Sequence, residues 1–125
     1  PDTIASSIAI GNPADGFHVL DTIRSSGGSG EMASDEEILS AIQLLARTEG
    51  IFTEPAGGTT LAVAIKLIRN GRIPKDESTV VCITGNGYKT PEVIAPTIDQ
   101  PTLLGRSFRE FETFMTNREQ ERTVD

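Results

Sequence analysis

The 125-residue sequence has few cysteines, histidines and basic side chains, and each shortage argues against a class of protein. Its one cysteine, Cys82, permits no internal disulfide, and the apolar run 80–83 around it is typical of a buried small hydrophobic residue. One histidine, His18, with no CxxC pair argues against a metal site. Eleven Lys and Arg residues against 18 Asp and Glu residues give a net charge of −7, which disfavours nucleic-acid and anionic membrane partners.

Long apolar runs and the common catalytic fingerprints are also missing. No stretch approaches the ~18 apolar residues of a membrane span, and no basic region followed by an apolar one opens the chain. A cytoplasmic protein is therefore expected. The sequence contains no GxGxxG, no GxxxxGK[ST] and no GxSxG pattern. It opens at Pro1 without a methionine, and we expect that part of the protein precedes it.

Helical spacing of apolar residues predicts four helices. Asp15 is expected to cap the first, which ends near Arg24. The second is expected over residues 35–49, after a capping box of Ser34 and Glu37 and before Gly50. The third is expected to begin at a cap on Thr59 or Thr60 and to end near 70–71, and the fourth follows a second capping box, Ser107 with Glu110. We expect that last helix to dock through its apolar stripe on the body of the protein, with residues beyond 117 solvated or frayed.

Two strands are predicted around the third helix. Residues 51–54 form a brief apolar run that Pro55 stops, with a turn at 56–58, and residues 79–84 form the continuous apolar run of a parallel strand covered on both faces. Together they predict a strand–helix–strand crossover and an α/β fold. Because the carboxyl ends of parallel strands meet at one edge of a sheet, the loops 54–58 and 84–87 are expected to lie together.

The glycines of these two loops permit close approach of backbone to a planar or anionic ligand. Spacing alone leaves open that they are ordinary turn residues, that Thr84 is a strand-end cap and that Glu54 is a solvated carboxylate. No Ser, His and acid arrangement can be built on one histidine, so hydrolytic catalysis is disfavoured.

The order of the elements resembles the second half of threonine synthases. IGNP at 10–13, SGG at 26–28, SDEEI at 34–38, EGIFTEPA at 49–56 and TGNGYK at 84–89 carry this resemblance over residues 3 to about 91. The sequence departs from the commoner family pattern at Tyr88, usually leucine, at Thr90, usually aspartate, and at Gly58, often alanine or serine.

The resemblance implies a fold-type II pyridoxal-phosphate enzyme, a lyase that converts O-phosphohomoserine and water to threonine and phosphate. It implies a three-layer fold with a mostly parallel sheet, with residues 1–100 in the large cofactor-binding domain and 101–125 as a helical extension. The family's Schiff-base lysine and phosphate loop belong to the N-terminal half. Lys66, Lys75 and Lys89 lack the serine-flanked context of that lysine, so the chain alone is expected to be inactive and to hold the cofactor weakly.

By motif matching, the resemblance implies five cofactor-binding positions. Thr84 corresponds to the hydroxyl residue that hydrogen-bonds the pyridine nitrogen, and Gly85 lets the backbone pass close to the ring. Glu54 matches a position beside the ring, and Ser6 and Ser7 match the segment that approaches from the other side. The implied partners are the missing N-terminal half, the substrate O-phosphohomoserine and a second copy in a homo-oligomer.

Three alternatives stay open. One is another fold-type II enzyme such as a threonine dehydratase. The second is a non-catalytic binding or interaction module that keeps a half-domain's fold, which the missing lysine favours. The third is a nucleotide-binding domain, which rests on the α/β pattern alone.

Overall fold

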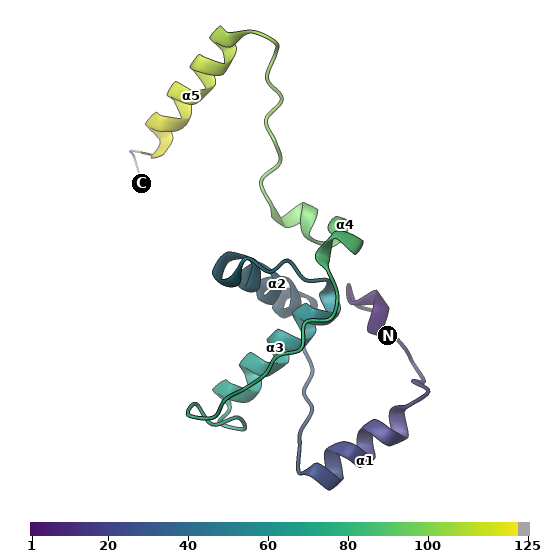
Figure 1. The fold of residues 1–125 in the computed structure, drawn as a ribbon. Helices are drawn as coiled ribbons and strands as arrows, with labels where there is room; N and C mark the ends of the chain where they lie inside the picture. Colours follow the sequence, from purple (N-terminus) through teal and green to yellow (C-terminus); the bar gives the residue numbers. More distant parts are fainter. Residues whose placement is uncertain (123–125) are drawn as a thin grey trace.

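The structure, a computed structural model, describes residues 1–122, which form helices joined by long segments without regular structure (Figure 1). In chain order these elements are η1 (Ser6–Ile8), α1 (Gly16–Ser26), α2 (Asp35–Glu49), α3 (Pro55–Arg69), η2 (Gly87–Lys89), α4 (Pro91–Ile94), η3 (Ala95–Thr97) and α5 (Phe108–Arg122), where η denotes a 3₁₀ helix. No helix of this part of the chain is both long and apolar enough to cross a membrane.

The helix α2 confirms the prediction made from its capping signals. The Ser34 hydroxyl accepts the Glu37 N–H at 3.3 Å, and the Glu37 carboxylate accepts the Ser34 N–H at 2.7 Å. Gly50 ends the helix at φ +68°, a left-handed conformation that glycine adopts without steric cost. The prediction for α1 is also confirmed, although the Asp15 side chain makes no capping hydrogen bond.

The predicted start of α3 was wrong. The helix begins at Pro55, with Glu54 as its N-cap, and not after a cap on Thr59 or Thr60. Proline suits the first helical position because its fixed φ matches the helix and its missing N–H has no partner there anyway. The hydroxyls of the two threonines donate back to the carbonyls one turn earlier, so residues 56–58 are helical rather than a turn.

The core lies where α2 packs on α3. Ile38 and Ile42 of α2 are buried, and Ala5, just before η1, joins them. Gly58 of α3 faces this contact: a Cβ there would lie 2.7 Å from Ile42 Cγ1 and 3.0 Å from the Ile38 carbonyl oxygen. The two helices therefore approach too closely for any side chain at position 58.

The expected strands do not form within residues 1–122. Residues 79–84 have no regular structure, no backbone hydrogen bond joins them to another described segment, and Val80 is 88% exposed. Cys82, expected to be buried, is exposed. A single antiparallel bridge, Thr53 with Asn86, replaces the predicted parallel pairing. A strand needs a neighbour on its edge, and no described segment lies there.

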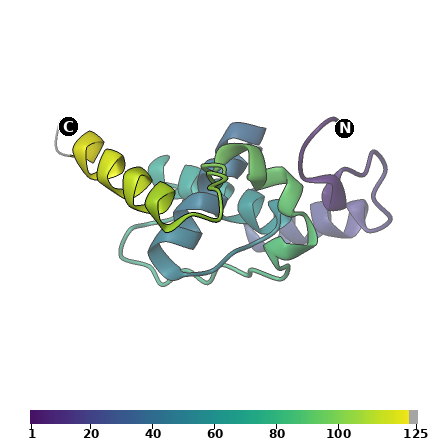
Figure 2. The same ribbon diagram turned by 90° about the horizontal axis from the view of Figure 1, so that it is seen from above.

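The helix α5 does not dock on the body of the molecule, contrary to expectation. Figure 1 shows it beyond α4 at the end of an extended segment, and in Figure 2 it projects at the end of the molecule away from the N-terminal segment. Phe108 is 73% exposed. The helix continues past Asn117 to Arg122, and its residues 118–120 are exposed, which agrees with the solvated form of the prediction rather than the frayed one. Residues 123–125 of the predicted extension lie outside the described residues.

Candidate cofactor-binding site

The loops that precede α3 and η2 lie together, as the sequence predicted, although through an antiparallel bridge. The Glu54 N–H donates to the Gly85 carbonyl at 3.2 Å, and the Gly87 N–H donates to the Phe52 carbonyl at 3.0 Å. These two hydrogen bonds flank the bridge between Thr53 and Asn86. Segments more than 30 residues apart in sequence are thereby fixed side by side.

Thr53 is the residue of this site that sequence reasoning missed. It is 1% exposed, and its hydroxyl lies 3.1 Å from the Gly85 carbonyl oxygen and 3.2 Å from that of Glu54. Gly57 makes room for it, because a Cβ at position 57 would collide with the Thr53 side chain. The available signal was a β-branched hydroxyl residue inside an otherwise apolar run, a pattern that also fits any solvent-facing strand position.

Glu54 and Gly85 lie in direct contact. The Glu54 side chain is 13% exposed, and a Cβ on Gly85 would meet its carboxylate. Lys89, whose side chain is 63% exposed, places its Nζ 3.5 Å from Glu54 Oε2. The missing side chain at position 85 therefore makes room for the Glu54 carboxylate, a use of this glycine that the sequence did not indicate.

Thr84 precedes Gly85 directly and is exposed, so its hydroxyl lies at the edge of the joined loops. Ser6 and Ser7 are also exposed, on η1, which contacts α3. The segment before η1 is anchored to α2, because the Thr3 hydroxyl donates to the Asp35 carboxylate at 2.6 Å. The structure thus brings Glu54, Gly85 and Thr84 into one region and keeps the serine pair on a separate element against the same helix.

The glycine and aromatic residues behind the loop 84–87 give it a fixed shape. Gly87 is buried, and a Cβ there would meet the Phe52 ring at 2.6 Å. That ring stacks edge to face with Tyr88, with centroids 5.3 Å apart. The Asn86 side chain accepts the Tyr88 N–H at 2.9 Å and so caps η2. The loop is built on a half-buried aromatic support.

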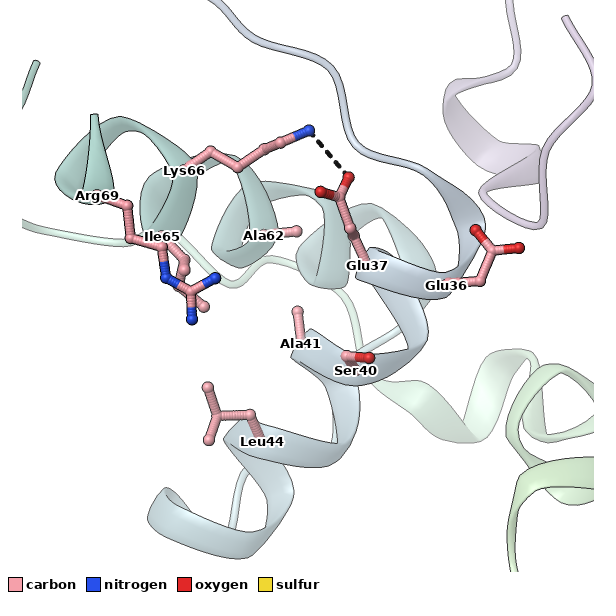
Figure 3. A pocket seen from close by; sticks show the side chains of 9 residues that line it. All are labelled: Glu36, Glu37, Ser40, Ala41, Leu44, Ala62, Ile65, Lys66 and Arg69. Carbon is pink, nitrogen blue, oxygen red and sulfur yellow. Dashed lines mark hydrogen bonds and ion pairs between the residues drawn. The ribbon is translucent and has the colours of Figure 1, made fainter.

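A hollow of about 310 Å³ lies between α2 and α3, and none of the predicted site residues lines it (Figure 3). The Lys66 Nζ donates to the Glu37 carboxylate at 2.9 Å and to the Met32 carbonyl at 2.7 Å. The Ser34 backbone N–H and then the Lys66 ammonium lower the pKa of Glu37, because both stabilise the charged carboxylate. Figure 3 shows the Arg69 guanidinium pointing into the space beside Leu44. Lys66 of α3 therefore forms an ion pair with Glu37 that links α3 to α2.

Among the described residues, His, Cys, Asp and Glu side chains form no group of three or more that could hold a metal ion. What the site offers is the exposed hydroxyl of Thr84 and the Glu54 carboxylate, held by the Lys89 ammonium group against the buried Gly85. These groups suit the ring and polar substituents of an organic cofactor.

The pyridoxal-phosphate dependent enzymes match this chain over residues 1–85, which is more than half of its length. The chain belongs to this family. A match of this extent covers both the loop before α3 and the start of the loop 84–87, so the candidate site falls inside the family region up to Gly85.

Within the family, the chain is similar to threonine synthases. It is 47% identical over 93 residues to the threonine synthase of Bacillus sp. (strain ULM1), covering 74% of this chain and 26% of that protein. It is 46% identical over 101 residues to that of Methanocaldococcus jannaschii, covering 81% and 25%. Over 92 residues it is 42% identical to that of Mycobacterium tuberculosis, covering 74% and 26%. The chain spans about a quarter of the length of the curated relatives it matches.

Proposed function

We propose that this chain is the C-terminal part of a threonine synthase, a lyase that converts O-phosphohomoserine and water to threonine and phosphate. Identities of 42–47% to threonine synthases, over 74–83% of the chain, carry the proposal. The five sequence elements that resemble the family lie within residues 10–89 and agree with the proposal. The intact enzyme acts in the cytoplasm and as a homo-oligomer.

The remainder of the enzyme supplies the strands that complete the fold of this chain. Residues 1–100 belong to the large cofactor-binding domain and 101–125 form a helical extension. The large domain is three-layered, with a mostly parallel sheet whose other strands come from the N-terminal half. The 88% exposure of Val80, within an apolar run that has no ladder here, supports this assignment, because such a run gains most from burial between layers.

Thr84, Glu54 and Gly85 form one wall of the pyridoxal-phosphate site, and Ser6 and Ser7 approach it from the other side. When bound, the cofactor withdraws electrons from the substrate. The Thr84 hydroxyl would hydrogen-bond the ring nitrogen as a neutral partner, which would leave that nitrogen largely unprotonated. Glu54, which contacts Gly85, would lie beside the ring. The exposed Thr84 directly beside the contact of Glu54 with Gly85 fits such a group, which supports this placement.

The chain alone is inactive, because the catalytic lysine and the phosphate loop come from the N-terminal half. Lys66 pairs with Glu37 outside the candidate site, and Lys75 lies exposed in the loop after α3. These two placements support the absence of a cofactor lysine from this part of the enzyme. Lys89 pairs with Glu54 inside the candidate site, and only its lack of the family's serine-flanked context argues against that role.

A pair of substrates tests the proposal. The protein that carries this chain, loaded with pyridoxal phosphate, is assayed with O-phosphohomoserine for threonine and phosphate and with threonine for ammonia. We expect stoichiometric threonine and phosphate from the first. Ammonia from threonine with no reaction of O-phosphohomoserine would assign the chain to a threonine dehydratase, and no reaction with either would favour a non-catalytic module.

A further inference from the structure

The Glu54 carboxylate is largely withdrawn from water, and the capping of α3 does not account for it. The Glu54 side chain is 13% exposed and packs against Gly85. Glu54 is the N-cap of α3, but its side chain makes no capping hydrogen bond to that helix. Removing a charge from water is unfavourable unless hydrogen bonds replace those of the solvent. The reason for a carboxylate at position 54 therefore lies outside the helix that it precedes.

Lys89 is the partner that the structure gives to this carboxylate. Its ammonium nitrogen donates to Glu54 Oε2 at 3.5 Å, and within residues 1–122 no other group donates a hydrogen bond to the Glu54 carboxylate. An ionised carboxylate can accept about four hydrogen bonds, so most of the capacity of Glu54 is unused. The placement of its charge thus depends on one long contact with a residue 35 positions away.

The backbone that carries Lys89 has a fixed place beside Glu54. The Lys89 N–H donates to the Asn86 carbonyl at 3.2 Å, within η2. The Gly87 N–H joins the same turn to the Phe52 carbonyl at 3.0 Å. The loop therefore presents the lysine to the carboxylate from a defined direction, although the Lys89 side chain is 63% exposed.

The exposure of Lys89 argues against a mainly structural role for this ion pair. A pair with one exposed partner contributes little to the stability of a fold, because water screens it and ordering a long side chain costs entropy. Another ion pair, Lys66 with Glu37, links α3 to α2. Lys89 with Glu54 instead joins the two loops of the candidate site. The main effect of the ammonium is on the carboxylate itself, because an unpaired charge withdrawn from water would turn toward the solvent.

We propose that Lys89 is a positioning residue of the candidate cofactor-binding site. Its ammonium holds the Glu54 carboxylate against Gly85 and so sets where that negative charge lies in relation to the cofactor ring. Lys89 acts through Glu54 and contacts neither the substrate nor the cofactor. The inference rests on the proposed function, in which Glu54 lies beside the ring.

A double-mutant cycle tests this dependence in the whole protein that carries this chain, loaded with pyridoxal phosphate. The cycle consists of the parent, Lys89→Met, Glu54→Gln and the double variant. Lys89→Met removes the charge and keeps an apolar side chain, and Lys89→Arg keeps the charge. The matched control is Lys75→Met, which removes a lysine charge from an exposed loop outside the site. Turnover and KM of O-phosphohomoserine, the visible circular dichroism of the bound cofactor and the melting temperature are measured for each protein.

We expect Lys89→Met to lower kcat roughly three- to fivefold, the loss that corresponds to a partly exposed ion pair, with KM and melting temperature unchanged. Its cofactor circular dichroism should change in the same direction as that of Glu54→Gln, because both variants lose the fixed negative charge beside the ring. Lys89→Arg should restore most of the lost turnover, and Lys75→Met should match the parent. In the Glu54→Gln background, the addition of Lys89→Met should change nothing further.

A raised KM with unchanged kcat that persists in the Glu54→Gln background would place Lys89 on an anionic group of the substrate and overturn the proposal. A lower melting temperature with unchanged turnover per folded molecule would make the ion pair a structural one and do the same. Unaltered cofactor circular dichroism in Lys89→Met would show that the carboxylate does not depend on the ammonium, which also refutes the proposal. A parent that binds the cofactor without converting O-phosphohomoserine would refute the proposed function alone, because the circular dichroism of the cycle still decides the role of Lys89.

Discussion

Replacing Thr53 by valine tests how the two loops of the candidate site are held together. Valine keeps the shape and β-branching of threonine, so packing at this 1% exposed position is preserved and only the hydroxyl is lost. That hydroxyl contacts the carbonyl oxygens of Gly85 and Glu54 at 3.1 and 3.2 Å. Both carbonyls keep another donor, the N–H of Glu54 and of Gly58 respectively. No buried group is left without a partner, and the cost is that of one net hydrogen bond, about 1 kcal/mol.

The amides of Glu54 and Gly87 report this loss, because they donate the two backbone hydrogen bonds that flank Thr53. A loss of about 1 kcal/mol lowers their protection from hydrogen exchange roughly fivefold. Thr60→Val is the matched control, since it removes a threonine hydroxyl from the exposed surface of α3. Unchanged exchange in Thr53→Val, or an equal change in the control, would refute the reasoning.

Three further predictions follow from the core, the capping box and the lysines. Gly58→Ala should lower the free energy of unfolding by about 1 kcal/mol, because overpacking against Ile42 costs roughly 1–3 kcal/mol and helix propensity returns about 1; a more stable variant in urea unfolding would contradict this. The contribution of Glu37 to α2 should be complete above its usual pKa of 4.5 and be lost as pH falls through its lowered pKa. Glu37→Gln should remove that step from a circular-dichroism titration, and an unchanged titration would assign the step to other carboxylates. The isolated chain should bind pyridoxal phosphate weakly, and reduction with borohydride should fix it to no single lysine; stoichiometric labelling of one lysine by mass spectrometry would disprove this.

Signals between residues close in sequence predicted α2 correctly, and features that depend on distant residues were not predicted. The capping contacts of Ser34, Glu37 and Gly50 involve only residues a few positions away, so the sequence of the helix itself is enough to predict them. Pro55 carries an ambiguous signal, because it both stops a strand and starts a helix, and the strand interpretation displaced the true start of α3.

The prediction of a strand at residues 79–84 was wrong for a different reason. Its composition fits a buried parallel strand, but a strand forms only when another segment offers its edge, and a sequence of one segment does not contain that information. In the described residues the run forms no ladder, with Val80 and Cys82 exposed and Val81 and Ile83 half-buried.

The proximity of the two loops was predictable, and the bonding between them was not. The strand–helix–strand pattern predicted that loops 54–58 and 84–87 lie together, and the structure brings Glu54 and Gly85 into contact. The part played by Thr53 rests on a partner 32 residues away, and the pairing of Lys89 with Glu54 on one 35 residues away. No periodicity within a segment reports such contacts.

The most direct test of the account is Thr84→Val in the whole protein that carries this chain. Turnover of O-phosphohomoserine and melting temperature are measured on one preparation loaded with pyridoxal phosphate. Loss of one hydrogen bond to the ring nitrogen, about 0.5–1.5 kcal/mol, predicts turnover reduced by roughly two- to tenfold with the melting temperature unchanged. A lower melting temperature with unchanged turnover per folded molecule would make Thr84 a strand-end cap and contradict its place at the cofactor.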